Sequence, residues 1–335
     1  MIISRAPLRI TLGGGGTDLP SYYKQYGGFL ISGAINKYIL VGANKQFYDN
    51  YSLKYSKIEI AKRKNDIGHK LIREALKLLD IKPGIEITSL ADIPSGTGLG
   101  SSGAFLVSLL NTLHHYKGNN PTKRQLAEEA CKIELEILKE HEGKQDKYAC
   151  AFGGIKAYKF LDYGKVEVMP LIDEDIIISE LESKLHLYFT GEKRKGTASD
   201  ALKTQDEKTK KGDSEYLSYL HQIKVIGKES ANALQKGDFD KFGILLNDHW
   251  EIKKQYSPEC TNDFIEKCYK TAIDNGSLGG KIMGAGGGGG FFMFYHPGPS
   301  KETWDFQREM KKLGLHEMPF KFDREGVSII SKEEK

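Results

Sequence analysis

The sequence of 335 residues predicts an α/β first half followed by an α+β second half. Two observations favour this order. Up to about residue 170, short apolar runs typical of strands alternate with stretches that have the periodicity of helices. Beyond that point, three helical stretches follow one another before strand-like runs return. We therefore expect two domains, formed by residues 1–170 and residues 171–335.

The first half is expected to begin with a strand over residues 2–12, followed by strand-like runs over 29–46. Apolar residues recur at helical spacing over 66–79, which predicts an amphipathic helix. Residues 84–88 alternate in polarity, as the residues of a half-buried strand do. These elements are consistent with a sheet that is covered by helices.

Residues 104–110 are apolar nearly all round, which is typical of a buried helix. The N-terminus of this helix, at Ser101 and Ser102, is predicted to point into the structure. Its unpaired amides and the positive end of its dipole suit an anion there. A capped core helix without a ligand is the alternative, but the glycines directly before it favour phosphate.

Another helix is expected to begin near Thr122, because Thr122 and Gln125 have the spacing of a capping box. The helix runs to about Ile137, and its apolar arc includes Glu134 but not Glu136. A carboxylate on a buried face must be paired or bound to a metal. Glu134 is therefore the better candidate for a functional acid.

In the second half, residues 191–212 are rich in Lys, Thr, Ser and Asp, which predicts a solvated loop or a lid over a charged ligand. The remaining expected elements are strands at 155–160, 165–169, 185–190, 291–295, 318–322 and 327–330, and helices at 215–236, 239–255, 262–275 and after Pro299.

The composition limits the class of protein. A hydrophobic content of 39% and a net charge of +4 are ordinary for a soluble protein, and the charge is too small to indicate a nucleic-acid partner. No segment has the length or apolarity of a signal peptide core or a membrane span. Cys131, Cys150, Cys260 and Cys268 lack zinc-ligand spacing, so we expect reduced thiols in the cytosol.

Three glycine-rich clusters stand out, at residues 13–16, 94–103 and 281–290. Backbone without side chains can approach an anion closely, whereas each glycine costs conformational entropy, so the clusters need a reason. Flexible linkers are the alternative, but strand-like residues flank every cluster. The clusters therefore predict a phosphate-binding or sugar-binding site.

Several common nucleotide-binding motifs are excluded. Gly284, Gly286 and Gly289 match G-x-G-x-x-G, but a strand-like run follows them where a dinucleotide fold needs a helix. Asn275 and Ile282 occupy positions where a P-loop needs Gly and Ser or Thr. Ala-Phe-Gly at 151–153 lacks the metal-binding Asp of eukaryotic protein kinases.

The remaining pattern, Pro-x-x-x-Gly-Leu-Gly-Ser-Ser at 94–102 with the first and third clusters, resembles the GHMP small-molecule kinases, which include galactokinase, homoserine kinase and mevalonate kinase. All three family motifs occur in the expected order over residues 7–291. The resemblance implies ATP and Mg²⁺ as cofactors. It also implies an N-terminal domain like domain 2 of ribosomal protein S5 and a ferredoxin-like C-terminal α+β domain.

In that family the second motif holds the ATP phosphates at a helix N-terminus, and its last serine, here Ser102, touches Mg²⁺. Glu134 would complete the metal site, which agrees with the preference of Mg²⁺ for hard oxygens and retained waters. The positions implied to bind ATP are Pro94, Gly96, Gly98, Leu99, Gly100, Ser101, Ser102 and Gly103. Gly103 stands where most family members have Ala, which we expect to loosen the helix start.

The resemblance assigns Asp146 as the catalytic base for the acceptor hydroxyl and Arg9 as the cation that stabilises the moving phosphoryl group. Taken alone, Asp146 could belong to an ordinary turn, Arg9 to a surface ion pair and Asp18 to a turn cap. The positions implied to face the substrate are Gly14, Gly15, Gly16, Thr17, Asp18, Gly286 and Gly287.

Within the family, Gly-Gly-Gly-Thr-Asp-Leu-Pro at 14–20 looks most like the branch of D-glycero-α-D-manno-heptose 7-phosphate kinases. It is also similar to the kinase part of L-fucokinases. Thr-Gly-x-x-Arg at 190–194 resembles a segment of the heptose branch, which makes Arg194 the candidate for binding the 7-phosphate. A solvated Arg194 among neighbouring lysines is the alternative.

The resemblance therefore implies an ATP-dependent kinase for the anomeric 1-hydroxyl of heptose 7-phosphate. Such an enzyme would act in the cytoplasm on small molecules, toward GDP-heptose for bacterial surface glycans, and a homodimer is left open. Three rivals remain: a kinase for an unphosphorylated sugar such as L-fucose, a non-catalytic sugar or nucleotide sensor, and an ATP-dependent decarboxylase on the same fold.

Overall fold

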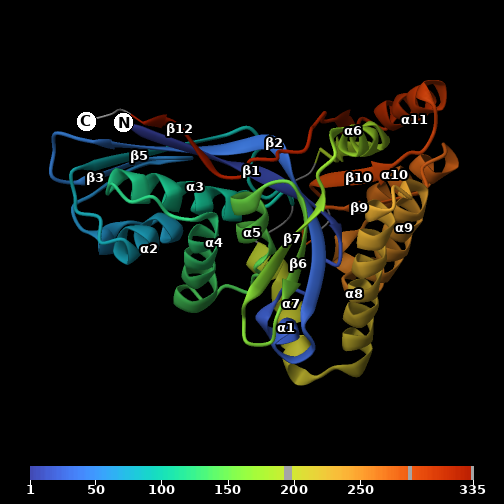
Figure 1. Cartoon of the computed structure of the whole chain (residues 1–335), viewed down its shortest axis with the longest axis horizontal. Coiled ribbons are helices and arrows are strands. Elements are labelled where there is room, and N and C mark those ends of the chain that lie inside the picture. The colour runs from blue at the N-terminus through green and yellow to red at the C-terminus, as the bar shows by residue number, and fades with distance from the viewer. Residues whose placement is uncertain (192–197, 286–288, 333–335) are drawn as a thin grey trace.

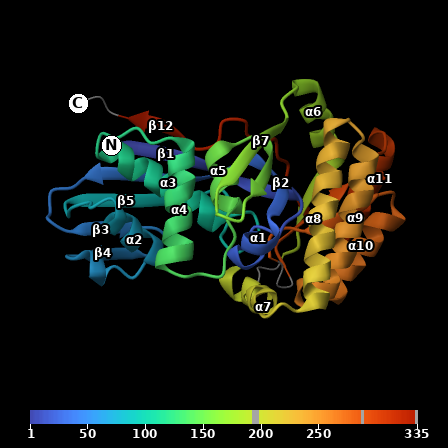
Figure 2. The same ribbon diagram turned by 60° about the horizontal axis from the view of Figure 1, so that its bottom comes forward.

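The computed structural model describes residues 1–191, 198–285 and 289–332. The two halves of the chain lie side by side along the long axis of the molecule (Figure 1). In the first half, helices cover one face of a large sheet, and in the second half, helices pack on a smaller sheet (Figure 2). The predicted order of an α/β half and an α+β half is therefore confirmed.

The larger sheet contains eight strands in the described residues: β1 (Ile2–Gly13), β2 (Gly28–Lys45), β3 (Tyr51–Lys54), β4 (Ile58–Ala61), β5 (Ile85–Ala91), β6 (Ile155–Phe160), β7 (Val166–Ile172) and β12 (Ser328–Lys332). Their order is β12-β1-β2-β5-β3-β4, and β6 pairs with both β2 and β7. The long strand β2 pairs with β1 on one edge and, on the other, with β6 and then β5. All pairs are antiparallel except β3 with β5.

The last strand returns to the first sheet. Strand β12 pairs antiparallel with β1, and Lys332 lies opposite Ile2, so the two ends of the chain lie at the same end of the molecule (Figure 1). The division of the chain at residue 170 stays a prediction, but the C-terminal strand packs with the N-terminal half.

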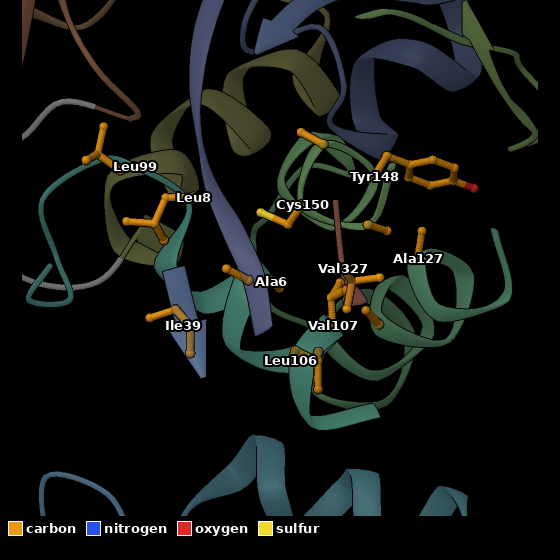
Figure 3. Close-up of a cluster of buried hydrophobic side chains, with 14 of the residues drawn as sticks. Ala6, Leu8, Ile39, Leu99, Leu106, Val107, Ala127, Tyr148, Cys150 and Val327 are labelled. Carbon is orange, nitrogen blue, oxygen red and sulfur yellow. The ribbon is translucent and has the colours of Figure 1, made fainter. Parts of the chain in front are cut away.

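The helical elements of the first half are α1 (Pro20–Tyr26), η1 (Lys64–Asp66), α2 (Lys70–Leu78), α3 (Ser101–Tyr116), α4 (Lys123–Cys131), the π-helical turn η2 (Lys132–Ile137) and α5 (Gln145–Phe152). Helix α3 is buried, as its uniform apolarity predicts. Figure 3 shows the core around it, where Leu8 of β1, Leu106 and Val107 of α3, and Cys150 of α5 are close together. This core supports the helix end that faces the cavity.

The second half is built on a four-stranded antiparallel sheet of described residues: β8 (Leu185–Phe189), β9 (Gly279–Ile282), β10 (Phe291–Tyr295) and β11 (His316–Glu317), in the order β11-β8-β10-β9. Its helices are α6 (Asp175–Lys184), α7 (Ala198–Lys211), α8 (Ser214–Gln235), α9 (Phe239–Tyr256), η3 (Pro258–Cys260), α10 (Asp263–Asp274) and α11 (Ser300–Lys312). Trp250, Phe292 and Phe294 form the centre of its core.

Two predicted elements of the second half are wrong. Residues 198–211, expected to be loop, form helix α7, whose buried face carries the polar residues Gln205, Asp206 and Thr209. Because this face is polar and held by hydrogen bonds, the sequence lacks the hydrophobic periodicity that would have indicated a helix. Residues 318–322 are not a strand: the short β11 precedes them, and Phe322 makes a single bridge to Ile35.

In the described ranges, no helix combines the length and apolarity needed to cross a lipid bilayer. Cys131, Cys150, Cys260 and Cys268 are all buried and unbridged, as expected. Burial raises the pKa of each thiol, so all four are protonated at neutral pH. These residues therefore have a packing role.

Candidate active site

The three glycine clusters meet at one cavity of about 910 Å³. Strands and helices of both halves form its walls. The glycines that line it come from all three clusters: Gly15 and Gly16 from the first, Gly96, Gly98 and Gly100 from the second, and Gly284 from the third. The central expectation from the sequence, that these clusters share one site, agrees with this arrangement.

The second and third clusters touch through their backbones. A Cβ atom at Gly98 would lie 2.4 Å from the carbonyl oxygen of Met283, and a Cβ atom at Gly284 would lie 2.8 Å from Cα of Gly98. Nearby, the amide of Phe291 donates to the carbonyl oxygen of Thr97 at 3.2 Å. The contact between the two halves at the cavity therefore requires glycine at both positions.

We expect Gly98→Ala to weaken the binding of ATP, the cofactor that the family resemblance implies, at least roughly tenfold and to lower the melting temperature, because the added methyl group would push the two clusters apart. Gly96→Ala is the matched control: both glycines have positive φ, +87° and +82°, but the space around Gly96 is open. A positive φ alone costs about 1–2 kcal/mol for a side chain. Calorimetric titration with ATP measures the difference, and equal losses in both variants would contradict the contact.

Arg9 joins the second cluster to Asp146. Its Nε and Nη2 atoms lie 2.7 Å and 2.6 Å from Oδ1 of Asp146, and Nη1 donates to the carbonyl oxygen of Gly98 at 2.6 Å. The amide of Arg9 also donates to the carbonyl oxygen of Leu99 at 2.9 Å. Arg9 is only 5% exposed, so the alternative of a surface ion pair is wrong.

Asp146 lies in the first turn of α5, where this helix packs against Gly103 of α3. A Cβ atom at Gly103 would lie 2.6 Å from Cβ of Asp146 and 3.0 Å from its carbonyl carbon. Glycine at this position therefore allows the close packing that places Asp146 beside the N-terminal end of α3. This role goes beyond the predicted loosening of the helix start.

Glu134 lies on η2 and meets the start of α3. Ser102 Oγ donates to Glu134 Oε1 at 2.6 Å, and Glu134 is 3% exposed, whereas Glu136 is exposed. The choice of Glu134 as the buried carboxylate is confirmed. The predicted continuous helix is instead α4 followed by a π-helical turn, a local rearrangement that often occurs at functional sites.

Lys147 neutralises Glu134. Its Nζ atom forms an ion pair with Glu134 Oε2 and donates to the carbonyl oxygen of Gly143 at 3.1 Å. Burial lowers the pKa of Lys147, but the negative charges of Glu134, Glu142 and Asp146 outweigh it and raise the pKa overall, so Lys147 stays charged. The ion pair lacks hydrogen-bond geometry, so Glu134 Oε2 is a buried oxygen without a hydrogen-bond donor.

Asp18 faces the cavity from the first cluster. It is 4% exposed, and Oδ2 accepts a hydrogen bond of 2.9 Å from the amide of Gln145. A Cβ atom at Gly143 would overlap this carboxylate, so glycine makes room for it. Burial raises the pKa of Asp18 from its ordinary value, and the bond from Gln145 offsets this only in part.

We expect Asp18→Asn to stabilise the free protein at neutral pH while lowering kcat/KM roughly 10- to 100-fold, because the family resemblance implies that Asp18 is a charged acceptor for substrate hydroxyls. Because the pKa of Asp18 is raised above its ordinary value of 3.8, the protonated side chain is compatible with folding below pH 3.8. As pH rises through the pKa of Asp18 in the folded protein, the carboxyl ionises and its burial lowers the free energy of unfolding. The melting temperatures of the two proteins should therefore differ at pH 7 and converge in acid. A less stable variant at pH 7 would contradict this account.

Thr17 does not face the cavity. It is fully buried, and its hydroxyl lies 2.9 Å from the carbonyl oxygens of Gly14 and Phe29 and accepts from the amide of Phe29 at 3.1 Å. The expectation that Thr17 touches the substrate is therefore corrected, because Thr17 is buried away from the cavity and its hydroxyl proton is directed at backbone carbonyls of the first cluster and β2. Gly14 likewise packs against Phe29, away from the cavity lining.

Other predicted site residues divide into those that line the cavity and those that support it. Gly96, Ser101 and Ser102 line it, and Ser101 Oγ is buried without a hydrogen-bond partner. Pro94, Leu99 and Gly103 lie behind this lining. Arg194, Gly286 and Gly287 fall outside the described residues, so their predicted roles stay predictions.

Helix α7 closes the cavity beside the first cluster. Gln205 Nε2 donates to the carbonyl oxygen of Gly16 at 2.7 Å. His141 is held by the same helix, because its amide donates to Ser199 Oγ at 2.8 Å and its Nδ1 lies 2.7 Å from Asp206. The segment predicted as loop or lid thus contributes a helical wall, attached by side chains that the sequence did not single out.

Comparisons with known proteins agree with this geometry. The family description "GHMP kinases N terminal domain" matches residues 68–154, and "GHMP kinases C terminal" matches residues 230–311. The chain is 32% identical to D-glycero-alpha-D-manno-heptose 7-phosphate kinase of Campylobacter jejuni, over 97% of this chain and 98% of that one. The chain belongs to the GHMP kinases. It is therefore a phosphotransferase.

Two further relatives of this GHMP kinase bear on its substrate. It is 27% identical to L-fucokinase/L-fucose-1-P guanylyltransferase of Bacteroides fragilis, over 88% of this chain and 34% of that one. The crystal structure of a D-glycero-D-manno-heptose 1-phosphate kinase from Bacteroides thetaiotaomicron superimposes with a TM-score of 0.81, at 27% identity over the full length of both chains.

Sequence reasoning missed several residues that line the cavity of this GHMP kinase. Lys147 follows Asp146 directly, and its burial could be inferred only from the ion pair with Glu134. His249 and Lys253 are four residues apart on α9, so they share one face of the helix, and Lys281 opens the third cluster. This spacing is a signal that could have grouped His249 with Lys253, but not with Lys281.

Proposed function

We propose that this GHMP kinase transfers the γ-phosphate of ATP to the anomeric 1-hydroxyl of D-glycero-α-D-manno-heptose 7-phosphate, with Mg²⁺. The observation that carries the proposal is that one cavity contains Asp146 with Arg9, Ser102 with Glu134, and Asp18. These groups are a base, a metal-binding pair and a hydroxyl acceptor, which together are the parts that phosphoryl transfer to a sugar requires.

The nucleotide is expected to lie along α3. The triphosphate would be held at the N-terminus of this helix, where Ser101 and Ser102 line the cavity. Next to it, the cavity wall carries the rings of Tyr55, His69 and Phe105, with centroids 4.7 Å and 5.2 Å apart in succession. An aromatic and apolar wall at that place suits a purine ring.

Ser102 and Glu134 fit a magnesium ion. Their oxygens are hard donors already 2.6 Å apart, and the other oxygen of Glu134, Oε2, is buried and in contact with the ammonium group of Lys147. Mg²⁺ keeps several waters and binds substrate phosphates, so two protein oxygens are enough. Ser102 and Glu134 would hold the ion, which would help to neutralise the charge that develops during phosphoryl transfer.

Asp146 and Arg9 would act on the acceptor. Asp146 is placed to orient the anomeric hydroxyl and take its proton, while Arg9 holds the carboxylate in position and offers positive charge to the moving phosphoryl group. Asp18 would accept hydrogen bonds from other sugar hydroxyls. The groups are held by backbone contacts between the two halves, so positioning supplies much of the rate enhancement.

The heptose assignment is supported by relatives whose names carry a heptose phosphate. These names differ in the position of the phosphate, which leaves the acceptor position to be measured. An unphosphorylated sugar such as L-fucose is the second candidate, because the fucokinase relative matches 88% of this chain. In either case we expect a cytoplasmic enzyme, and the heptose reaction would lead toward GDP-heptose for surface glycans.

A panel of free and phosphorylated sugars, tested with ATP and Mg²⁺, decides between these candidates. Heptose 7-phosphate should be consumed fastest, and phosphorus NMR of its product should show a new anomeric phosphate beside the original one. Faster turnover of L-fucose would contradict the heptose assignment. ATP binding without turnover of any sugar would favour a non-catalytic sensor.

A further inference from the structure

Three basic side chains form one cluster in the cavity wall contributed by the C-terminal half. His249 and Lys253 come from α9 and Lys281 from β9, and they are 2%, 5% and 3% exposed. We call them the basic cluster. Nδ1 of His249 lies 3.3 Å from Nζ of Lys281, and Lys253 donates to the carbonyl oxygens of Gly284 and Ile282 at 2.7 Å and 3.2 Å. The cluster is thus attached to the third glycine cluster.

Burying positive groups is costly unless negative charge compensates them. The charged groups that act most strongly on Lys281 are Lys253 and Arg9, and those that act on His249 are Lys281 and Lys253. All of these neighbours are positive. Burial, first, and these positive charges, second, lower the pKa of both Lys281 and His249 well below their ordinary values, so the free protein disfavours the protonated form of each side chain.

We propose that the basic cluster binds a phosphate monoester carried by the acceptor sugar. This inference rests on the proposed function. It assigns a binding site, formed by residues that the structure describes, to the phosphate that heptose 7-phosphate already carries. A phosphate dianion would accept hydrogen bonds from Lys281 and His249 and would supply the missing negative charge. Its arrival would let the pair take up a proton.

The acceptor is a better source of this phosphate than ATP. The groups suited to the ATP phosphates, namely the second glycine cluster, Ser102 and Glu134, all belong to the N-terminal half. The basic cluster belongs to the C-terminal half, where Tyr256 and Ser257 continue the cavity lining beside it. A volume of about 910 Å³ is near the upper end of the range for one ligand, so a second anionic ligand has room.

Lys281→Gln and His249→Gln test the proposal, with Lys241→Gln as the matched control, because Lys241 is exposed on the same helix as His249. We expect KM for heptose 7-phosphate to rise roughly 10- to 100-fold in both test variants. KM for ATP should change less than about threefold, and Lys281→Arg should recover part of the loss. A rise confined to KM for ATP would overturn the assignment to the acceptor.

A binding measurement separates failure of this site from failure of the proposed function. Inorganic phosphate is titrated into protein saturated with Mg²⁺ and a non-hydrolysable ATP analogue, near pH 8, in two buffers that differ in ionisation enthalpy. Binding should be accompanied by proton uptake. The principal charged neighbours of Lys281 and His249 in the free protein are the positive side chains of Lys253 and Arg9. A bound phosphate adds a negative charge beside the pair, which favours the protonated forms of both side chains.

Both phosphate binding and proton uptake should be lost in Lys281→Gln and retained in Lys241→Gln. Lys281-dependent binding upholds the anion site even if heptose 7-phosphate is not turned over, in which case the proposed function alone fails. Unchanged phosphate binding in a folded Lys281→Gln or His249→Gln variant overturns the inference.

Discussion

Asp146→Asn should reduce kcat by roughly 10²- to 10⁴-fold while ATP binds almost as tightly as before. The asparagine side chain keeps the shape of Asp146 and can still accept a hydrogen bond from Arg9, but it cannot take a proton from the acceptor. The contacts proposed for ATP come from α3 and the second glycine cluster, not from α5. The expected loss therefore lies in turnover rather than in nucleotide affinity.

Steady-state kinetics and calorimetric titration with ATP measure the two quantities separately. Asp162→Asn is the control for removing one carboxylate, because Asp162 is exposed in the turn between β6 and β7 and does not line the cavity. Turnover within about threefold of the wild type in Asp146→Asn would show that Asp146 is not the base. A parallel loss of ATP affinity would show instead that Asp146 mainly maintains the structure through Arg9.

Much of the fold could be predicted because its elements have apolar periodicity. Helix α3 and strand β10 are buried and apolar, and the predictions for them hold closely, including residues 291–295 for β10. Helix α7 could not be predicted in this way. Its buried face carries polar groups such as Gln205, which bonds to the backbone of Gly16, so tertiary hydrogen bonds replace the hydrophobic signal.

The candidate site was predictable where a local pattern carries the chemistry. Glycine clusters and the apolar arc around Glu134 are visible in one stretch of sequence, and the structure brings them to one cavity. Residues whose role depends on a distant partner were missed. Lys147 matters because Glu134 is buried against it, and Lys281 because α9 brings His249 beside it. Thr17 shows the opposite error, since its match to the family motif implied a substrate contact, whereas the structure buries it away from the cavity.

Lys147→Met should lower the free energy of unfolding by about 3–5 kcal/mol, the usual cost of leaving a buried charge without its partner. Lys147 is 1% exposed, and its ammonium group is the ion-pair partner of Glu134, which is equally inaccessible to water. The raised pKa of Lys147 means that its charge contributes its full stability below pH 10.5, as long as Glu134 is ionised, and that this contribution is lost as pH rises through the pKa of Lys147 in the folded protein. Denaturant unfolding at pH 7 measures the loss.

Combining Lys147→Met with Glu134→Gln should restore much of that stability, because the variant contains neither charge. Activity should stay low in the double variant, since the carboxylate proposed to bind Mg²⁺ is then absent. Lys270→Met is the control for a surface ion pair. Because Lys270 and Asp274 are both largely exposed, we expect the free energy of unfolding to fall by less than about 1 kcal/mol. A double variant that regains stability without activity would indicate that the charges of Glu134 and Lys147 are needed for catalysis and not for the stability of the fold. A double variant as unstable as Lys147→Met would instead place the main contribution of Lys147 in its bond to the backbone of Gly143.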